Sequence, residues 1–367
     1  MKVHGSLKLV LAAMCASLVL VFMAGLAGAA ELPAQALSHA NPRVQEVMAA
    51  QVAATPELMA LPDVLGTAVG QDDKGDLTIL VFVNLEAKNP AASAARIPAS
   101  LRGRSLAVRF TEPFRALGKV KVPKVSHTAK QTPPIKLGTS GGWGHDLANG
   151  YCCGGTLGSL IQIGATQYIL SNYHVFEADI ALGDNNRVAQ TGDPVVQPGL
   201  IDVACNLNNA QVVATLVKRS SLPGSNVDAA IAQVLPGMVA SDGAILEIGP
   251  LSSQTRAAAL KLAVKKSGRT TGLTRSTISG LNATVKVVYD DECAGSMAFE
   301  KTFTGQIIIA NRASKFLAGG DSGSLMVEDV VNSPRAVGLL FAGSSSLAVA
   351  NPIDEVLGFF GASMVGQ

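Results

Sequence analysis

The spacing of hydrophobic positions changes near Gly150. Before this point, apolar residues after Asn41-Pro42 recur as they do on one face of a helix. Two apolar runs follow, 64–70 and 77–83, and the turn-forming residues between them predict a β-hairpin. Beyond Gly150, short β-like runs alternate with Gly, Asn, Asp and Pro turns, and no long helical pattern interrupts them. The pattern therefore predicts a small α+β unit followed by a mainly β unit.

The first unit, residues 31–116, is expected to have the order helix, two strands, helix, strand. Pro56 and Pro62 should end the first helix, an Ala-rich piece after Asn89-Pro90 predicts the second helix, and 106–110 predicts the third strand. We expect the helices on one face of an antiparallel sheet. The unit carries no cluster of titratable residues. Its place in the chain leaves two alternatives open, a removable prodomain and a permanent accessory domain.

Residues 150–367 are predicted to form the mainly β unit. Many short strands with frequent turns are typical of a barrel or a pair of packed sheets. Ahead of this unit, residues 117–149 lack periodicity and contain several Pro, Gly and Lys residues, which predicts an extended linker. The expected strands are 156–163, 168–171, 188–190, 211–217, 229–234, 284–289, 303–310, 324–328 and 336–341, with a closing helix within 351–360.

Residues 1–30 have the layout of a secretory signal peptide. Two lysines precede an apolar run, 9–26, and the small residues 27–30 follow it. We expect cleavage near Glu31, a secreted or periplasmic protein, and no stable membrane association after cleavage. An uncleaved N-terminal anchor is the alternative, because the apolar run approaches the length of a membrane span.

Composition and charge exclude some partners. The chain has 48% hydrophobic and 15% charged residues, as a globular protein does, and a net charge of +2. No run of Lys and Arg forms a patch that could follow a phosphate backbone, so we expect no nucleic-acid partner. The sequence leaves the oligomeric state open.

Removal of the signal leaves an even number of cysteines, Cys152, Cys153, Cys205 and Cys293. In an oxidising compartment these are expected to form disulfides, including a bridge from Cys152 or Cys153 to Cys205, and the sequence does not choose among the pairings. The cysteines have neither C-x-x-C spacing nor accompanying histidines, so we expect no metal site.

A glycine-rich turn at Gly320-Asp321-Ser322-Gly323 is the most specific chemical signal. Glycine adopts backbone conformations that other residues avoid, so the amides of Gly320 and Ser322 are expected to face a developing oxyanion, with Asp321 supporting the turn. Serine is a weak nucleophile without an adjacent base, so the hypothesis requires a His and a carboxylate elsewhere. An ordinary surface loop is the alternative, whereas an α/β-hydrolase elbow would need Gly in place of Ser324.

His174 and Asp228 are the candidates for the base and its partner. His174 follows the apolar run 168–171, and the end of a buried strand holds a general base still. Asp228 stands at the head of the apolar run 229–234, which would carry the carboxylate into the interior, where it would orient the imidazole. Asp202 is the competing carboxylate.

These motifs, in the order His, Asp, Ser, resemble those of the chymotrypsin-like serine peptidases. The run Cys153-Gly154-Gly155-Thr156-Leu157, followed by a turn and the strand to His174, is similar to the segment that leads to the catalytic His of trypsin-like enzymes. The resemblance covers 150–360. It extends to the second barrel of streptogrisin-like and α-lytic-like peptidases at 266–274, 278–285 and 337–343, and to the trypsin-like Narrow-leaf proteins of plants at 151–154 and 197–202.

The resemblance implies two perpendicular antiparallel β-barrels, with His174 and Asp228 from the first barrel and Ser322 from the second. It implies acyl transfer by these residues without a metal or an organic cofactor. By position relative to Ser322, it also implies a specificity pocket that accepts an apolar or small side chain. The wall of this pocket would include Phe316, Leu317, Ala318 and Gly343.

The sequence departs from the family in three places. Ser324 stands where many relatives have Gly, and Val175 follows His174 where a disulfide-forming Cys is common. No Arg-Ile-Val-Gly-Gly activation site is present, so a new N-terminus of the trypsin type cannot organise Asp321.

We therefore predict a secreted serine endopeptidase that acts on protein or peptide substrates. The alternatives are an esterase with the same acyl-enzyme chemistry, a catalytically silent pseudoprotease that binds proteins, and a β-rich surface or adhesion protein.

Overall fold

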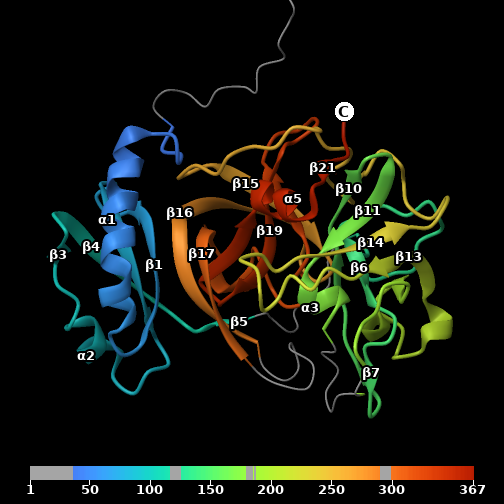
Figure 1. Cartoon of the computed structure of the whole chain (residues 1–367), viewed down its shortest axis with the longest axis horizontal. Coiled ribbons are helices and arrows are strands. Elements are labelled where there is room, and N and C mark those ends of the chain that lie inside the picture. Colours follow the sequence, from blue (N-terminus) through green and yellow to red (C-terminus); the bar gives the residue numbers. More distant parts are fainter. Residues whose placement is uncertain (1–35, 116–124, 179–184, 186, 290–298) are drawn as a thin grey trace, which may run out of the picture. The chain divides into compact units, whose positions relative to one another are not determined.

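The computed structural model describes residues 36–115, 125–178, 185, 187–289 and 299–367, and this part of the chain is mainly β (Figure 1). Nearly all strands belong to two sheets, one of 11 strands and one of 8. The larger sheet contains a ring of strands that strand pairing closes, and the smaller sheet contains an open ring, whose two ends are joined by the chain. The expected fold class, two antiparallel β-barrels preceded by a small α+β part, is therefore confirmed.

The first ring lies in the 8-stranded sheet, where β10, β11, β14, β13, β12, β6 and β9 pair in this order. The paired order ends at β9, and Gly158 alone separates β9 from β10, so the chain and not a strand pairing joins the two ends of this open ring. Trp143, Leu170 and Ile231 are among the buried side chains that fill it. The strands are β6 (Thr139–Trp143), β9 (Gly155–Leu157), β10 (Ser159–Ile163), β11 (Thr166–Ser171), β12 (Pro194–Gln197), β13 (Gln211–Val217) and β14 (Ala230–Val234).

The second ring lies in the larger sheet. Strands β15, β18, β19, β20, β17 and β16 pair in this order, and β15 also pairs with β16, which closes this ring. Figure 1 draws these strands in orange and red. They are β15 (Ala263–Gly268), β16 (Gly272–Tyr289), β17 (Phe299–Ala310), β18 (Leu325–Glu328), β19 (Ala336–Gly343) and β20 (Leu347–Pro352).

The N-terminal elements extend the same sheet, because β1 pairs with β16. Helix α1 lies along β1 in Figure 1, and its buried Val44, Val47 and Leu58 pack in one apolar cluster with Val69 and Ile79. The element order follows the prediction. The elements are α1 (Pro42–Met59), β1 (Val64–Gln71), β2 (Leu77–Asn84), α2 (Pro90–Ala94), β3 (Ser100–Leu101), β4 (Arg104–Thr111) and β5 (Phe114–Arg115).

Two details of this part differ from the prediction. The first helix continues through Pro56 to Met59, and the Thr55 hydroxyl donates to the Gln51 carbonyl in the preceding turn. The sheet is mixed rather than antiparallel, because β4 runs parallel to β2. The connection through α2 crosses over between these strands, which is the geometry that a parallel pair requires.

The expected linker over 117–149 also differs from the structure. Residues 116–124 lie outside the described residues, but β6 is a strand of the first ring, and Ile135 and Leu137 are fully buried ahead of it. The strand has no hydrophobic alternation because small residues fill it. A Cβ on Gly141 would lie 2.3 Å from Leu157 Cγ, so only glycine permits this approach.

The run 188–190, expected to be a strand, is a loop in which the Gln190 amide donates to Asp193 Oδ2. The described residues contain no helix with the length and apolarity to cross a membrane. The remaining elements are β7 (Leu147–Ala148), β8 (Tyr151–Cys152), α3 (Tyr173–Phe176), η1 (Leu200–Asp202), η2 (Leu207–Asn209), η3 (Arg312–Ser314), α5 (Ile353–Phe360) and β21 (Ser363–Met364).

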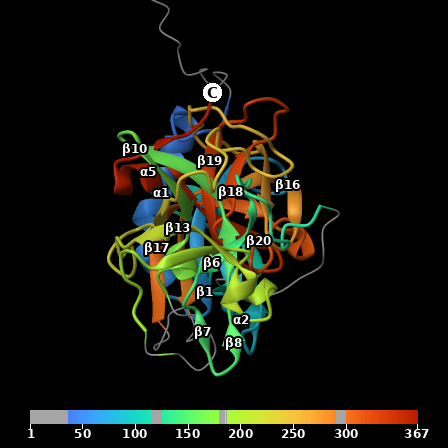
Figure 2. The same cartoon turned by 90° about the vertical axis from the view of Figure 1, so that its right-hand side faces the viewer.

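A disulfide joins Cys152 of β8 to Cys205, with an S–S distance of 2.10 Å. It therefore ties the β7–β8 hairpin, which projects at the bottom of Figure 2, to the segment that follows η1. Of the two bridges to Cys205 that the sequence left open, the structure contains the one from Cys152. Cys293 and the expected signal peptide lie outside the described residues.

Candidate active site

His174 and Asp228 meet where β11 and β14 run side by side. Ser171 pairs with Ala230 at this point, and the chain enters α3 directly after β11. His174 Nδ1 lies 2.7 Å from Asp228 Oδ2, and both side chains are buried. An ionised carboxylate only accepts hydrogen bonds, so Nδ1 donates and Nε2 keeps a lone pair for a proton.

Asp228 is held by further contacts from both rings. Its Oδ1 accepts the Tyr173 amide at 2.7 Å, and its carbonyl oxygen accepts Asn172 Nδ2 at 2.7 Å. Its own amide donates to Oδ1 of Asn351, on β20 of the second ring, at 3.0 Å. The carboxylate therefore has a fixed orientation toward the imidazole.

The turn around Ser322 is docked against the first ring. Thr156 of β9 donates its amide to the Ser322 carbonyl at 2.9 Å and its hydroxyl to the Gly320 carbonyl at 2.8 Å. The approach depends on glycine, because a Cβ on Gly158 would lie 2.0 Å from the Gly323 carbonyl oxygen. Gly323 itself has a φ of 89°, in the left-handed region.

The same contacts bring the Ser322 turn to the end of β11 that leads into His174. Ser171 donates its hydroxyl to the Thr156 carbonyl at 2.8 Å, and a Cβ on Gly323 would lie 2.2 Å from Ser171 Oγ. Within the described residues, the His174 ring bonds to Asp228 and makes no hydrogen bond with Ser322 Oγ. Catalytic hydrogen bonds are often long in proteins without substrate, so this geometry suits a site that tightens on binding.

The backbone amides of the turn fall into two groups. Those of Asp321, Gly323 and Ser324 donate to the carbonyls of Ala318, Leu340 and Asp321. Those of Gly320 and Ser322 have no acceptor among the described residues. The latter are the two amides that the sequence assigns to an oxyanion.

Asp321 supports the turn through a buried cation that the sequence analysis missed. Lys266 Nζ lies 3.1 Å from Asp321 Oδ2, and neither side chain is exposed. The carboxylate also accepts the amides of Thr270 and Thr271, at 2.9 and 3.1 Å, and the amide of Ala318 at 3.0 Å. Burial lowers the pKa of Lys266, while Asp321 acts to raise it. A lysine beside apolar strand positions was the only signal in the sequence.

Asp202, the competing carboxylate, has other partners. It accepts Nε and Nη2 of Arg269 at 2.7 and 2.6 Å, and the hydroxyl of Ser140 at 2.6 Å. Arg269 follows β15, whereas Asp202 belongs to η1 and Ser140 to β6. This ion pair therefore bridges the two rings.

The four residues expected in the pocket wall lie together, held by Asn311, which the sequence analysis did not identify. Asn311 Oδ1 accepts the amides of Phe316 and Leu317, and its Nδ2 donates to the carbonyls of Leu317 and Ser344. A Cβ on Gly343 would lie 3.2 Å from Leu317 Cδ2. Phe316, Leu317 and Ala318 are each only 2% exposed, so the wall is closed against solvent.

The end of the N-terminal part covers the neighbouring edge of β19. Arg115 of β5 pairs antiparallel with Gly343, and Phe114 pairs in parallel with Val287 of β16. The hydroxyls of Thr111 and Ser344 lie 2.6 Å apart and add a side-chain link. The backbone at Arg115 therefore occupies β19 at Gly343, one of the four residues expected in the pocket wall.

No family model matches the chain, and no curated protein matches it. Solved structures that match include a glutamic acid specific serine protease, with 18% identity and a TM-score of 0.42 over 63% of this chain and 100% of that one. Protease A of Thermobifida fusca matches with 20% identity and a TM-score of 0.42 over 64% and 99% of the two chains. Cellulomonas bogoriensis chymotrypsin matches with 19% identity and a TM-score of 0.39 over 64% and 99%. Similarity at this level gives no support to a shared activity.

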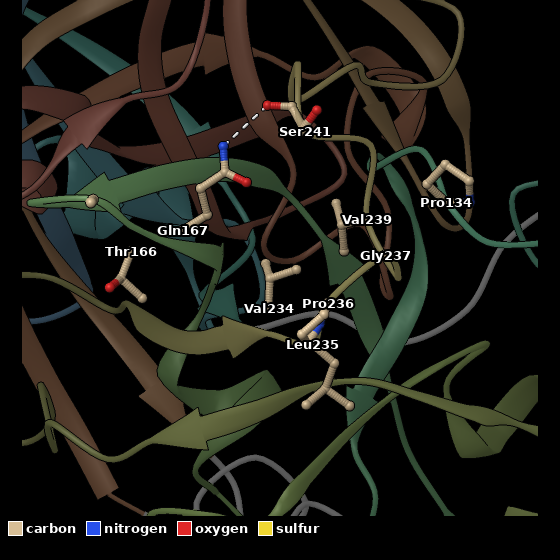
Figure 3. Close-up of a pocket in the computed structure, with 10 residues that line it drawn as sticks. Pro134, Thr166, Gln167, Val234, Leu235, Pro236, Gly237, Val239 and Ser241 are labelled. Carbon is tan, nitrogen blue, oxygen red and sulfur yellow. Dashed lines mark hydrogen bonds between the residues drawn. The ribbon is translucent and has the colours of Figure 1, made fainter.

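A cavity of about 580 Å³ lies on the first ring (Figure 3). Thr166 and Gln167 of β11 and Val234 of β14 line it, and Gln167 Nε2 donates to the Ser241 carbonyl at 3.1 Å. Its lining contains none of the candidate catalytic residues and no charged side chain. The candidate active site is therefore the turn of Ser322 with His174 and Asp228, and not this cavity.

Proposed function

We propose that this protein is a serine endopeptidase in which Ser322, His174 and Asp228 act as a catalytic triad. The observation that carries the proposal is the buried 2.7 Å contact between His174 Nδ1 and Asp228 Oδ2, next to the glycine turn of Ser322. A carboxylate in this position fixes the tautomer of the imidazole and stabilises the imidazolium that forms during acyl transfer.

In the proposed reaction, Ser322 Oγ attacks the carbonyl carbon of a peptide bond and His174 Nε2 takes the hydroxyl proton. The amides of Gly320 and Ser322 donate to the resulting oxyanion. The C–N bond then breaks as His174 returns the proton to the leaving amine, which leaves an acyl group on Ser322. Water, activated by His174, hydrolyses this ester and restores the serine.

The substrate is proposed to bind as an extended strand along β19. The antiparallel pairing of Arg115 with Gly343 supports this mode, because it is the kind of backbone contact that a substrate strand would make. The apolar wall of Phe316, Leu317 and Ala318 favours an apolar or small side chain before the scissile bond.

The N-terminal part is proposed to be a prodomain that blocks the cleft and is removed on maturation. The proposal is supported by β5, which covers the edge that a substrate strand would use. The disulfide and the expected signal peptide support secretion or a periplasmic location.

Fluorophosphonate labelling tests the proposed activity. The protein is expressed as the full chain and labelled after the N-terminal part has been removed, beside the variant Ser322→Ala. The parent should label and cleave a mixed peptide library. The variant should not label, and its kcat should fall on the order of 10⁶-fold. A correctly folded and processed parent that neither labels nor cleaves would make the protein a catalytically silent member of this fold.

A further inference from the structure

A tyrosine that the proposed mechanism does not use reaches its carboxylate. The Tyr289 hydroxyl donates to Asp228 Oδ2 at 2.7 Å, and this oxygen also accepts His174 Nδ1. Tyr289 is the last residue of β16, in the ring that carries Ser322, and it is fully buried. One carboxylate oxygen therefore receives a donor from each ring.

The tyrosine ring is held in place by its neighbours. It stacks on Phe299, with ring centroids 4.8 Å apart and an angle of 12° between the planes, and it lies 6.4 Å from Phe303. Its centroid is 6.0 Å from that of His174. Because aromatic packing restricts the ring, the position of the hydroxyl is fixed by the second ring and not by Asp228 alone.

The groups around Asp228 explain why a hydrogen bond from Tyr289 matters for its carboxylate. On the side of α3, burial raises the pKa of Glu177, and Asp228 contributes to the increase. Burial likewise raises the pKa of Tyr173, with Glu177 and Asp228 contributing. The charge of Asp228 thus lies among groups that do not neutralise it. The donors that face it are His174 Nδ1, the Tyr173 amide and the Tyr289 hydroxyl.

We propose that Tyr289 is a positioning residue for the reaction. Its hydroxyl holds Asp228 Oδ2 toward His174. Because Tyr289 belongs to the second ring, the same contact aligns His174 and Asp228 of the first ring with Ser322 of the second. This inference rests on the proposed serine endopeptidase function. Tyr289 acts through Asp228 and does not touch the reacting atoms.

The variant Tyr289→Phe removes only the hydroxyl and keeps the packed ring. A hydrogen bond to a charged group is lost, so we expect kcat to fall roughly 10-fold to 100-fold, with KM within about twofold of the parent. With one donor fewer, Oδ2 should favour the protonated imidazole more strongly in the free enzyme, while the less firmly oriented carboxylate slows the reaction. The acid limb of the pH profile of kcat/KM should therefore move to higher pH. Glu177 and Tyr173 on the side of α3 are unchanged in this comparison.

The protein is expressed as the full chain and assayed after maturation on a p-nitrophenyl ester. Titration of active sites by fluorophosphonate ensures that kcat refers to folded sites only. Tyr168→Phe is the matched control, because it removes the same hydroxyl from a tyrosine on β11 that is half-buried against the apolar cluster of the first ring. In an Asp228→Asn background, Tyr289→Phe should change kcat less than about twofold, because both changes act on the same contact.

An active parent whose Tyr289→Phe variant keeps kcat and the acid limb would overturn the role of Tyr289. An effect of the same size with and without Asp228→Asn would also overturn it, since the tyrosine would then act only on the fold. A correctly folded and processed parent without labelling or hydrolysis would overturn the proposed function itself, so the two failures are distinguishable.

Discussion

Lys266 and Asp321 form an ion pair in which Nζ and Oδ2 lie 3.1 Å apart and neither side chain reaches solvent. Asp321 directly precedes Ser322, so a cation on β15 holds the turn that presents the candidate nucleophile. The sequence contains no trypsin-type activation site that could supply this charge from a new N-terminus. In this chain the interior provides it, and the turn is formed in the unprocessed protein.

Replacing Lys266 should therefore affect both stability and labelling. Lys266→Met leaves the Asp321 carboxylate buried without its cation, and we expect the free energy of unfolding to fall by about 3–5 kcal/mol. Fluorophosphonate labelling of Ser322 should be lost with the turn. Urea unfolding and labelling measure the two effects. The control is Lys286→Met, which removes a partly exposed lysine from β16. A Lys266→Met protein with parental stability and labelling would contradict this role.

Replacement of Asp228 is expected to lower activity, whereas replacement of Asp202 is expected to lower stability. Asp228→Asn should lower kcat by about 10⁴-fold, because an amide beside His174 Nδ1 permits the wrong tautomer. Asp202→Asn should retain activity and lose stability, because it weakens the bidentate contact with Arg269. Steady-state kinetics on a peptide substrate, with thermal unfolding of both variants, measure the difference. The reverse pattern would reassign the carboxylate to Asp202.

The sequence predicted the fold class because its apolar runs have strand length and its turns carry Gly, Asn, Asp and Pro. It missed β6, whose Ser140, Gly141 and Gly142 have no hydrophobic alternation. Tertiary packing determines that strand: glycine is required because Leu157 lies against it. It likewise missed β15, in which Lys265 and Lys266 are buried.

The candidate triad could be read from local motifs, since each residue stands beside a strand or turn with its own pattern. Its supporting residues could not. Lys266 and Tyr289 contact Asp321 and Asp228, which lie far from them in the sequence, and the folded rings bring these pairs together. Asn311 contacts Phe316 and Leu317 five and six positions ahead of it, but its side chain resembles that of any polar residue in a loop.

Acid should weaken the fold through Glu328. Burial acts to raise its pKa, but hydrogen bonds from Arg335 and Arg256 outweigh burial and lower the pKa of Glu328 from 4.5 to about 2. Since the folded-state value lies below the unfolded one, the ionised carboxylate stabilises the fold above about pH 4.5, and this contribution is lost as the pH falls toward 2. Glu328→Gln should be less stable than the parent at pH 7 and less sensitive to pH in that window.

Urea unfolding of the parent and Glu328→Gln at several pH values checks this prediction. The matched control is Glu86→Gln, because Glu86 is exposed in the turn after β2. The control should keep the parental dependence on pH. If the free energy of unfolding falls equally with pH in the parent and in Glu328→Gln, other carboxylates cause the acid sensitivity.

Maturation is expected to leave a defined N-terminus. A substrate strand needs the edge of β19 that Arg115 occupies, so active protein should have lost the chain through β5. The cut should also precede His127, because this side chain is fully buried in contact with the Gly138 carbonyl, ahead of β6. N-terminal sequencing of the fluorophosphonate-labelled fraction should therefore find a start between residues 116 and 127.

The variant Ser322→Ala should accumulate uncut if the protein processes itself. Labelled, active protein that starts near Glu31 would instead make the N-terminal part a permanent accessory domain, and β5 would have to leave the edge without cleavage.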